Sequence, residues 1–151
     1  MRKLTLAATM TGLLGAALCV AGCQKGPGAD ELKKTLEARL AQNFGKGVFA
    51  LRDISRKGHY PLAAKEGKNH VLVYYNGRLE FLRDHRLSAW NQLNVGSLVS
   101  VLGATPLGVR GVKPTGNKKG DTLTIHGALA WVDAGDGRWQ SVAFTPRKNG
   151  K

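Results

Sequence analysis

The segment HVLVYYNGRLEFLRD, residues 70–84, decides the fold. Apolar and polar side chains alternate along most of it, which is the pattern of a β-strand with one buried face. Two arrangements are compatible with this pattern. In the first, Asn76-Gly77, a pair preferred in tight hairpin turns, folds two short strands back on each other. In the second, the segment is one long strand, although its length exceeds that of a typical strand.

The single long strand gives the more regular apolar face. The residues of that face are Val71, Val73, Tyr75, Gly77, Leu79 and Phe81. A second segment, residues 122–132, repeats the pattern, with a glycine again in the middle of the apolar face. The residues of that second face are Leu123, Ile125, Gly127, Leu129 and Trp131. Because a glycine inside a strand often marks a bend or the close approach of another backbone, we favour two long, curved strands and keep the hairpin as the alternative.

A helix is predicted over residues 30–44. Its apolar side chains recur every four positions and form one stripe. They are Leu32, Leu36, Leu40 and Phe44. Asp30 and Glu31 lie in the first turn, where the helix dipole favours negative charge, and Gly45 follows as a stop signal. The stripe needs a surface to cover, so we expect this helix to pack across the apolar face of the sheet.

Shorter elements complete the domain. Residues 88–102 are expected to be helical in part, with Ser88 as a capping residue. The sequence therefore predicts an α+β fold, in which an N-terminal helix packs on a curved antiparallel sheet and a short second helix follows. This order of elements resembles the cystatin and NTF2-like style of fold. That resemblance implies a fold that often holds binding pockets, but it does not fix a function.

The remaining segments are weaker predictions. A strand is expected over residues 48–54, with Arg56-Lys57-Gly58 and Pro61 interrupting it, and a second extended piece is expected to include Tyr60 and Leu62. Residues 108–121 are rich in Gly and Lys and are expected to form a loop. Residues 133–137 are typical of a hairpin turn that leads into a last strand at 139–144.

A leader precedes the domain. Residues 1–3 are Met-Arg-Lys, and residues 4–21 are apolar or small and carry no charge. That run is about long enough to span a membrane, so an uncleaved anchor and a plain signal peptide are alternatives. It ends, however, in Val20-Ala21-Gly22-Cys23, which resembles the lipobox of bacterial lipoproteins.

This resemblance implies cleavage before Cys23, followed by attachment of a diacylglycerol to its thiol and of an N-acyl chain such as palmitate to its amine. No other cofactor is expected. Cys19 leaves with the leader, so the mature chain keeps no free thiol. Because Gln24 and not Asp follows Cys23, the sorting rule of that family implies the outer membrane, facing the periplasm, if the cell is Gram-negative.

The chain is thus divided into four parts. Residues 1–22 are the signal peptide, and residues 23–29 are the lipidated cysteine with a flexible tether rich in Gly and Pro. Residues 30–144 form a single α+β domain. Residues 145–151 are a basic tail.

Catalytic motifs are absent from the sequence. The four histidines, at positions 59, 70, 85 and 126, have no spacing that directs two imidazoles at one metal ion. No GxSxG motif is present, and no pair of carboxylates stands out. We therefore expect neither an enzyme nor a metal site.

The positive charge has a local origin. The chain has 23 basic and 10 acidic residues, a net charge of +13, and without Arg2 and Lys3 the mature chain keeps +11. Residues 46–119 alone contain 13 basic and 4 acidic residues. Within them, residues 111–119 lack the lysine that a Walker phosphate loop needs directly after its second glycine. Candidate anion-binding residues remain there, namely Lys113, Lys118 and Lys119.

These features predict a non-catalytic lipoprotein of the cell envelope that binds or assembles with an envelope protein. The alternative is a protein that binds anionic lipid, lipopolysaccharide or a cell-wall polymer through its basic surface. A nucleic acid is not an expected partner, because the aromatic residues do not alternate with basic ones as in sheets that bind RNA.

Overall fold

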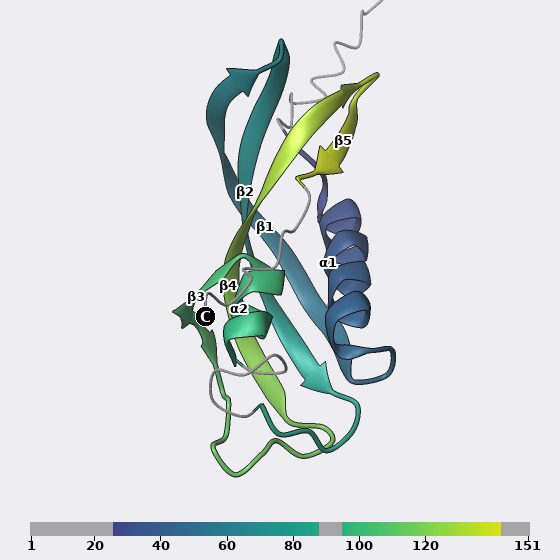
Figure 1. The fold of residues 1–151 in the computed structure, drawn as a ribbon, viewed down its shortest axis with the longest axis vertical. Coiled ribbons are helices and arrows are strands. Elements are labelled where there is room, and N and C mark those ends of the chain that lie inside the picture. The colour runs from purple at the N-terminus through teal and green to yellow at the C-terminus, as the bar shows by residue number, and fades with distance from the viewer. Residues whose placement is uncertain (1–25, 88–94, 143–151) are drawn as a thin grey trace, which may run out of the picture.

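The structure is a computed structural model, and it describes residues 26–87 and 95–142. It has the predicted α+β architecture, with two helices on one face of a five-stranded antiparallel sheet (Figure 1). In chain order the elements are α1 (Ala29–Phe44), β1 (Phe49–Lys65), β2 (Lys68–Phe81), α2 (Val95–Leu102), β3 (Ala104–Arg110), β4 (Thr122–Gly135) and β5 (Arg138–Ser141).

The two long strands predicted from the sequence lie side by side in the middle of the sheet. The strand order is β1-β2-β4-β3, and β5 also pairs with β4. β2 and β4 pair without a register shift from His70 opposite Val132 to Glu80 opposite Thr122. The long-strand prediction is therefore confirmed.

The alternative hairpin at Asn76-Gly77 is wrong. Asn76 lies in mid-strand, opposite Ser55 of β1 on one side and His126 of β4 on the other. The turn between β1 and β2 instead uses Glu66 and Gly67, whose φ angles are 53° and 71°. Both angles are positive, as the preferred two-residue hairpin turn requires.

The two extended pieces predicted before residue 65 form one strand, β1. It does not end near Ile54 but continues through Arg56-Lys57-Gly58 and Pro61 to Lys65, and it includes Tyr60 and Leu62. Three register shifts against β2 absorb the irregular stretch. Pro61 is tolerated because β1 is an edge strand, where a residue without an N–H breaks no ladder on its outer side.

The core lies between the sheet and the helices. The stripe on α1 is buried as predicted, with Leu32 and Leu36 fully covered. Trp131, Tyr75 and Phe81 are the largest fully buried side chains of this core. Burial of a side chain of this size contributes about 1.5–3 kcal/mol, so these two layers hold the fold together.

The surroundings of Gly127 explain why a glycine lies in the middle of the apolar face of β4. The Tyr75 hydroxyl donates a hydrogen bond of 2.5 Å to the Leu102 carbonyl across the core. A Cβ at position 127 would lie 2.6 Å from that carbonyl and 2.8 Å from the Tyr75 hydroxyl. The glycine therefore makes room for the tyrosine, as the sequence pattern suggested. Burial raises the pKa of Tyr75 well above its usual range, so the hydroxyl keeps its proton.

Two smaller differences concern element ends. The loop predicted from residue 108 begins later, because β3 extends to Arg110 and pairs with β4. The last strand begins at Arg138 and ends at Ser141. Ser88 and residues 143–151 lie outside the described residues, so the predicted cap and basic tail stay predictions.

Candidate functional site

The structure brings the three predicted anion-binding lysines together with two aspartates. The loop between β3 and β4 folds against the segment that follows β2. Lys113 Nζ lies 2.8 Å from Asp121 Oδ2, and Lys118 Nζ lies 3.2 Å from Asp84 Oδ2. The Lys119 backbone N–H donates a hydrogen bond of 2.9 Å to Asp84 Oδ1, and Lys119 itself is exposed. Two of the three lysine charges are therefore partly neutralised within the cluster.

Asn117 holds this loop in place and was not singled out from the sequence. It is 1% exposed, and its amide donates to the Gly111 carbonyl and accepts from the Lys113 backbone N–H, both at 3.0 Å. Its backbone exchanges two hydrogen bonds of 2.9 Å with His85. A buried, fully bonded Asn fixes the loop to the domain. No sequence pattern reveals it, because its partners come from two separate segments.

Both aspartates are held in the ionised form. The Lys119 backbone N–H and the Lys118 ammonium lower the pKa of Asp84 below its usual range. The Lys113 ammonium and the Lys118 backbone N–H lower the pKa of Asp121 in the same way. Hydrogen bonds to a carboxylate favour its charged form. The cluster is therefore a fixed arrangement of charges rather than a group that changes protonation near neutral pH.

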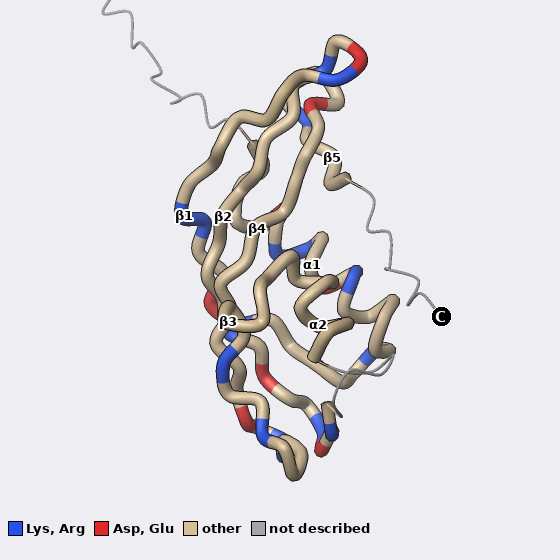
Figure 2. Tube along the Cα trace, turned by 60° about the vertical axis from the view of Figure 1, so that its left-hand side comes forward, with Lys and Arg blue, Asp and Glu red and all other residues tan. Residues whose placement is uncertain are grey.

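The whole of this end of the molecule is basic. Residues 82–87 and 110–121 together carry six basic and two acidic side chains, and all six basic residues are exposed. The six are Arg83, Arg86, Arg110, Lys113, Lys118 and Lys119. We call this surface the basic end. It lies at the lower end of the molecule in Figure 2, where several blue segments lie close together.

The sheet face opposite the helices is open, because neither helix covers it (Figure 2). Its lower half is polar. Arg52 Nε lies 2.9 Å from Glu80 Oε2, and Arg78 pairs with Asp53. These exposed pairs are typical of a solvated surface and contribute little stability.

The upper half of the open face is mainly apolar, with His70 opposite Leu62 at its edge. Leu72 and Tyr74 alternate with the buried Val71 and Val73 along β2, so they lie on the open face. Tyr60 lies directly opposite Leu72 on β1, and Leu62 lies two residues further along. We call Tyr60, Leu62, Leu72 and Tyr74 the distal patch. Its members are exposed by 60% (Tyr60), 38% (Leu62) and 45% (Tyr74), and Leu72 is half-buried.

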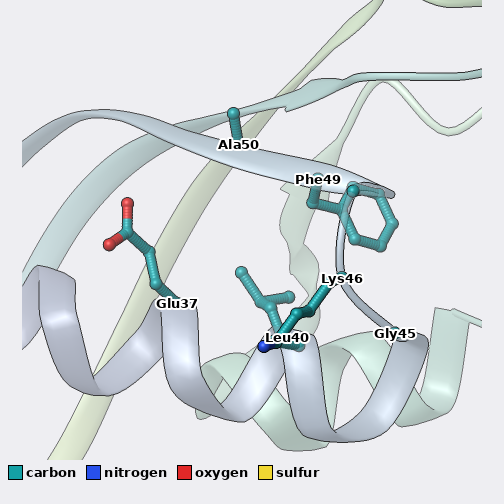
Figure 3. Close-up of a pocket in the computed structure, with 8 residues that line it drawn as sticks. Glu37, Leu40, Gly45, Lys46, Phe49 and Ala50 are labelled. Atoms are coloured by element: carbon teal, nitrogen blue, oxygen red, sulfur yellow. The ribbon is translucent and has the colours of Figure 1, made fainter.

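A small cavity of about 210 Å³ lies where α1 ends and β1 begins (Figure 3). Leu40 and Phe49 form its apolar wall, and Glu37 and Lys46 supply its charges. This lining contains neither a nucleophile with an adjacent base nor a set of metal ligands. Within residues 26–87 and 95–142, no three His, Cys, Asp or Glu side chains gather as a metal site would require.

The predicted lipidation site, Cys23, lies outside the described residues, which begin at Gly26. Gly26 and Pro27 are buried, although the sequence predicts a flexible tether there. Gly26 has φ of 116°, and a Cβ on it would lie 2.9 Å from the Val73 side chain. Gly26 is thus packed on the sheet, and α1 already begins at Ala29, the last residue of the predicted tether. No helix in the described part of the chain is long and apolar enough to cross a bilayer.

Comparisons with protein-family models, with curated proteins and with solved structures find no match to this chain. The fold and its surfaces therefore define the protein only by architecture: an α+β domain with one open sheet face, a basic end and an apolar distal patch.

Proposed function

We propose that the protein is a lipoprotein of the bacterial cell envelope, anchored through acyl chains on Cys23, whose domain binds an envelope protein and does not catalyse a reaction. The anchor rests on the similarity of Val20-Ala21-Gly22-Cys23 to a lipobox. The buried Gly26 lies only three residues after Cys23, so acyl chains on Cys23 would hold the domain close to the membrane surface. In a Gram-negative cell the site would be the outer membrane, facing the periplasm.

The basic end is the main observation that supports the proposed binding. Six exposed basic residues against two aspartates produce a positive field, and such a field attracts and orients an acidic partner. The hydrogen bonds of the loop support the same role, because Asn117 and the two aspartates hold the backbone that carries the lysines before a partner arrives. A preordered surface loses less entropy on binding.

The second candidate is binding of anionic lipid, lipopolysaccharide or a cell-wall polymer by the same charges. The arrangement in Figure 1 favours a protein over the bilayer that holds the anchor. Helix α1 starts near the upper part of the sheet, whereas the β3–β4 loop lies at the lower end. An anchored domain would therefore direct its basic end away from its own membrane.

Cross-linking in intact cells tests the binding proposal, with Lys119→Glu compared with Lys34→Glu. Both positions are exposed lysines, and Lys34 lies on α1, away from the basic end. We expect a specific cross-linked protein to be lost or strongly reduced for Lys119→Glu and retained for Lys34→Glu. Equal cross-linking in both variants would contradict the basic end as the contact surface. Binding of lipopolysaccharide or anionic vesicles that only Lys119→Glu weakens, without a protein cross-link, would favour the second candidate.

A further inference from the structure

We propose that the distal patch rests on the surface of the bilayer that holds the anchor, with its tyrosines at the level of the lipid headgroups. This inference rests on the proposed lipidation of Cys23. It assigns a ligand, a phospholipid surface, to a part of the sheet that the proposed protein contact at the basic end does not use.

The distal patch is an exposed apolar surface beside a charged one. It is the apolar half of an open sheet face whose other half carries exposed ion pairs. Two small residues of β4 extend it, since Ala128 lies opposite Tyr74 and Ala130 opposite Leu72. A contiguous apolar surface of this kind marks a contact with another molecule or with a membrane.

The packing of Gly26 places this patch close to the anchor. Gly26 packs against Val71 and Val73, and Leu72, the residue between them, belongs to the patch on the opposite face of the same strand. Three residues of extended chain reach about 10 Å. Side chains on the open face extend about 5 Å from the strand, half the spacing between packed sheets. Gly26 lies on the inner side chains of the strand, which add about 5 Å more, so the patch stays within about 20 Å of the Cys23 sulfur.

The chemistry of the patch and its surroundings fits a lipid surface. Tyrosine places an apolar ring in the acyl boundary and its hydroxyl among the headgroups, and it is enriched at that depth. Residues 55–74, which form most of the β1–β2 hairpin, carry four basic and one acidic side chain. Anionic headgroups attract such a segment. A second copy of the chain, in contrast, would bring the same positive charges together, so the charge disfavours a dimer through this face.

A fluorescence measurement tests the inference on the full-length protein, purified with its lipid. Tyr60→Cys and, separately, Leu62→Cys introduce a thiol for an environment-sensitive dye at exposed positions of the patch. Thr124→Cys is the matched control, because Thr124 is exposed on the polar half of the same face. The protein is placed in vesicles of zwitterionic and anionic phospholipid, with and without spin-labelled lipid. We expect a blue shift and lipid-dependent quenching at positions 60 and 62, and neither at 124.

The outcomes separate this inference from the proposed anchor, because mass spectrometry of the same samples shows whether Cys23 is acylated. Lipidated protein with unquenched dye at both patch positions would overturn the inference and leave the anchor standing. A blue shift without quenching by spin-labelled lipid would mean that a second copy or another protein covers the patch, which also overturns it. Protein without acyl chains would refute the anchor and remove the basis of the inference.

Discussion

Gly127 has no side chain, and this absence permits the burial of the large Tyr75 side chain. Its backbone lies against the Tyr75 ring and the Leu102 carbonyl, so Tyr75 can be buried with its hydroxyl bonded. We expect Gly127→Ala to lower the free energy of unfolding by about 1–3 kcal/mol, because the new methyl group overpacks the core. Urea unfolding followed by tryptophan fluorescence measures this change.

Gly58→Ala is the control for that experiment. A Cβ at position 58 has no atom within 4 Å, and its φ angle is not positive. The control should change stability by no more than about 0.5 kcal/mol. Equal destabilisation by both variants would show that Gly127 is not required by the tyrosine.

The two aspartates of the basic end should make the stability of the domain depend on pH. Because the pKa values of Asp84 and Asp121 are lowered in the folded state, their contribution to stability is present at neutral pH and is lost as the pH falls through the folded pKa values. NMR titration of the two carboxyl carbons should give midpoints below about 3.9, the value for Asp in peptides.

Lys118→Ala provides the internal comparison. This substitution removes the ammonium group that contacts Asp84. It keeps the backbone N–H of residue 118, which donates a hydrogen bond to Asp121. The midpoint of Asp84 should then rise, and that of Asp121 should change less. A midpoint for Asp84 that stays unchanged would mean that its ion pair with Lys118 does not form in solution.

At the scale of elements, the two hairpin signals show what local sequence can and cannot predict. Asn76-Gly77 is the better turn pair, yet it lies inside a strand, because β1 and β4 pair with it on both sides. Glu66-Gly67 forms the turn without having been predicted, since the residues before it include Pro61 and lack a regular apolar pattern. The period of the buried face was the more reliable signal because it records packing over the whole strand.

The turn at Glu66-Gly67 can be tested directly. Gly67 has φ of 71°, a left-handed conformation that costs a residue with a Cβ roughly 1–2 kcal/mol. Gly67→Ala should therefore destabilise the β1–β2 hairpin by about that amount, seen as faster amide hydrogen exchange at the hairpin end and a lower melting temperature. Exchange rates equal to those of Gly58→Ala would contradict the observed turn.

The candidate site was predictable only in part, for a physical reason. The lysines at 113, 118 and 119 lie in one short segment, so the sequence shows that they are close together. Their partner Asp84 is 34 residues from Lys118, and only the folding of the β3–β4 loop against the end of β2 joins them. The distal patch was missed for the same reason, since its members come from two strands whose pairing the sequence does not reveal.

At the scale of the whole molecule, the proposed anchor depends on one sulfur atom. Cys23→Ala should leave a longer precursor that incorporates no labelled fatty acid, because the thiol is the acceptor of the diacylglycerol. Cys19→Ala is the matched control and should be processed and acylated normally. Gel mobility and labelling of whole cells with a fatty-acid analogue measure both. Normal acylation of Cys23→Ala would refute the anchor.

The packing of Gly26 and Pro27 on the sheet has a consequence for any partner of an anchored domain. Only Gln24 and Lys25 separate this packed segment from Cys23, so the domain would be held within a short reach of its lipid. A partner attached to the same membrane would meet the basic end within a narrow range of heights. The encounter would then be confined to a thin layer, which raises the effective concentration of the two surfaces.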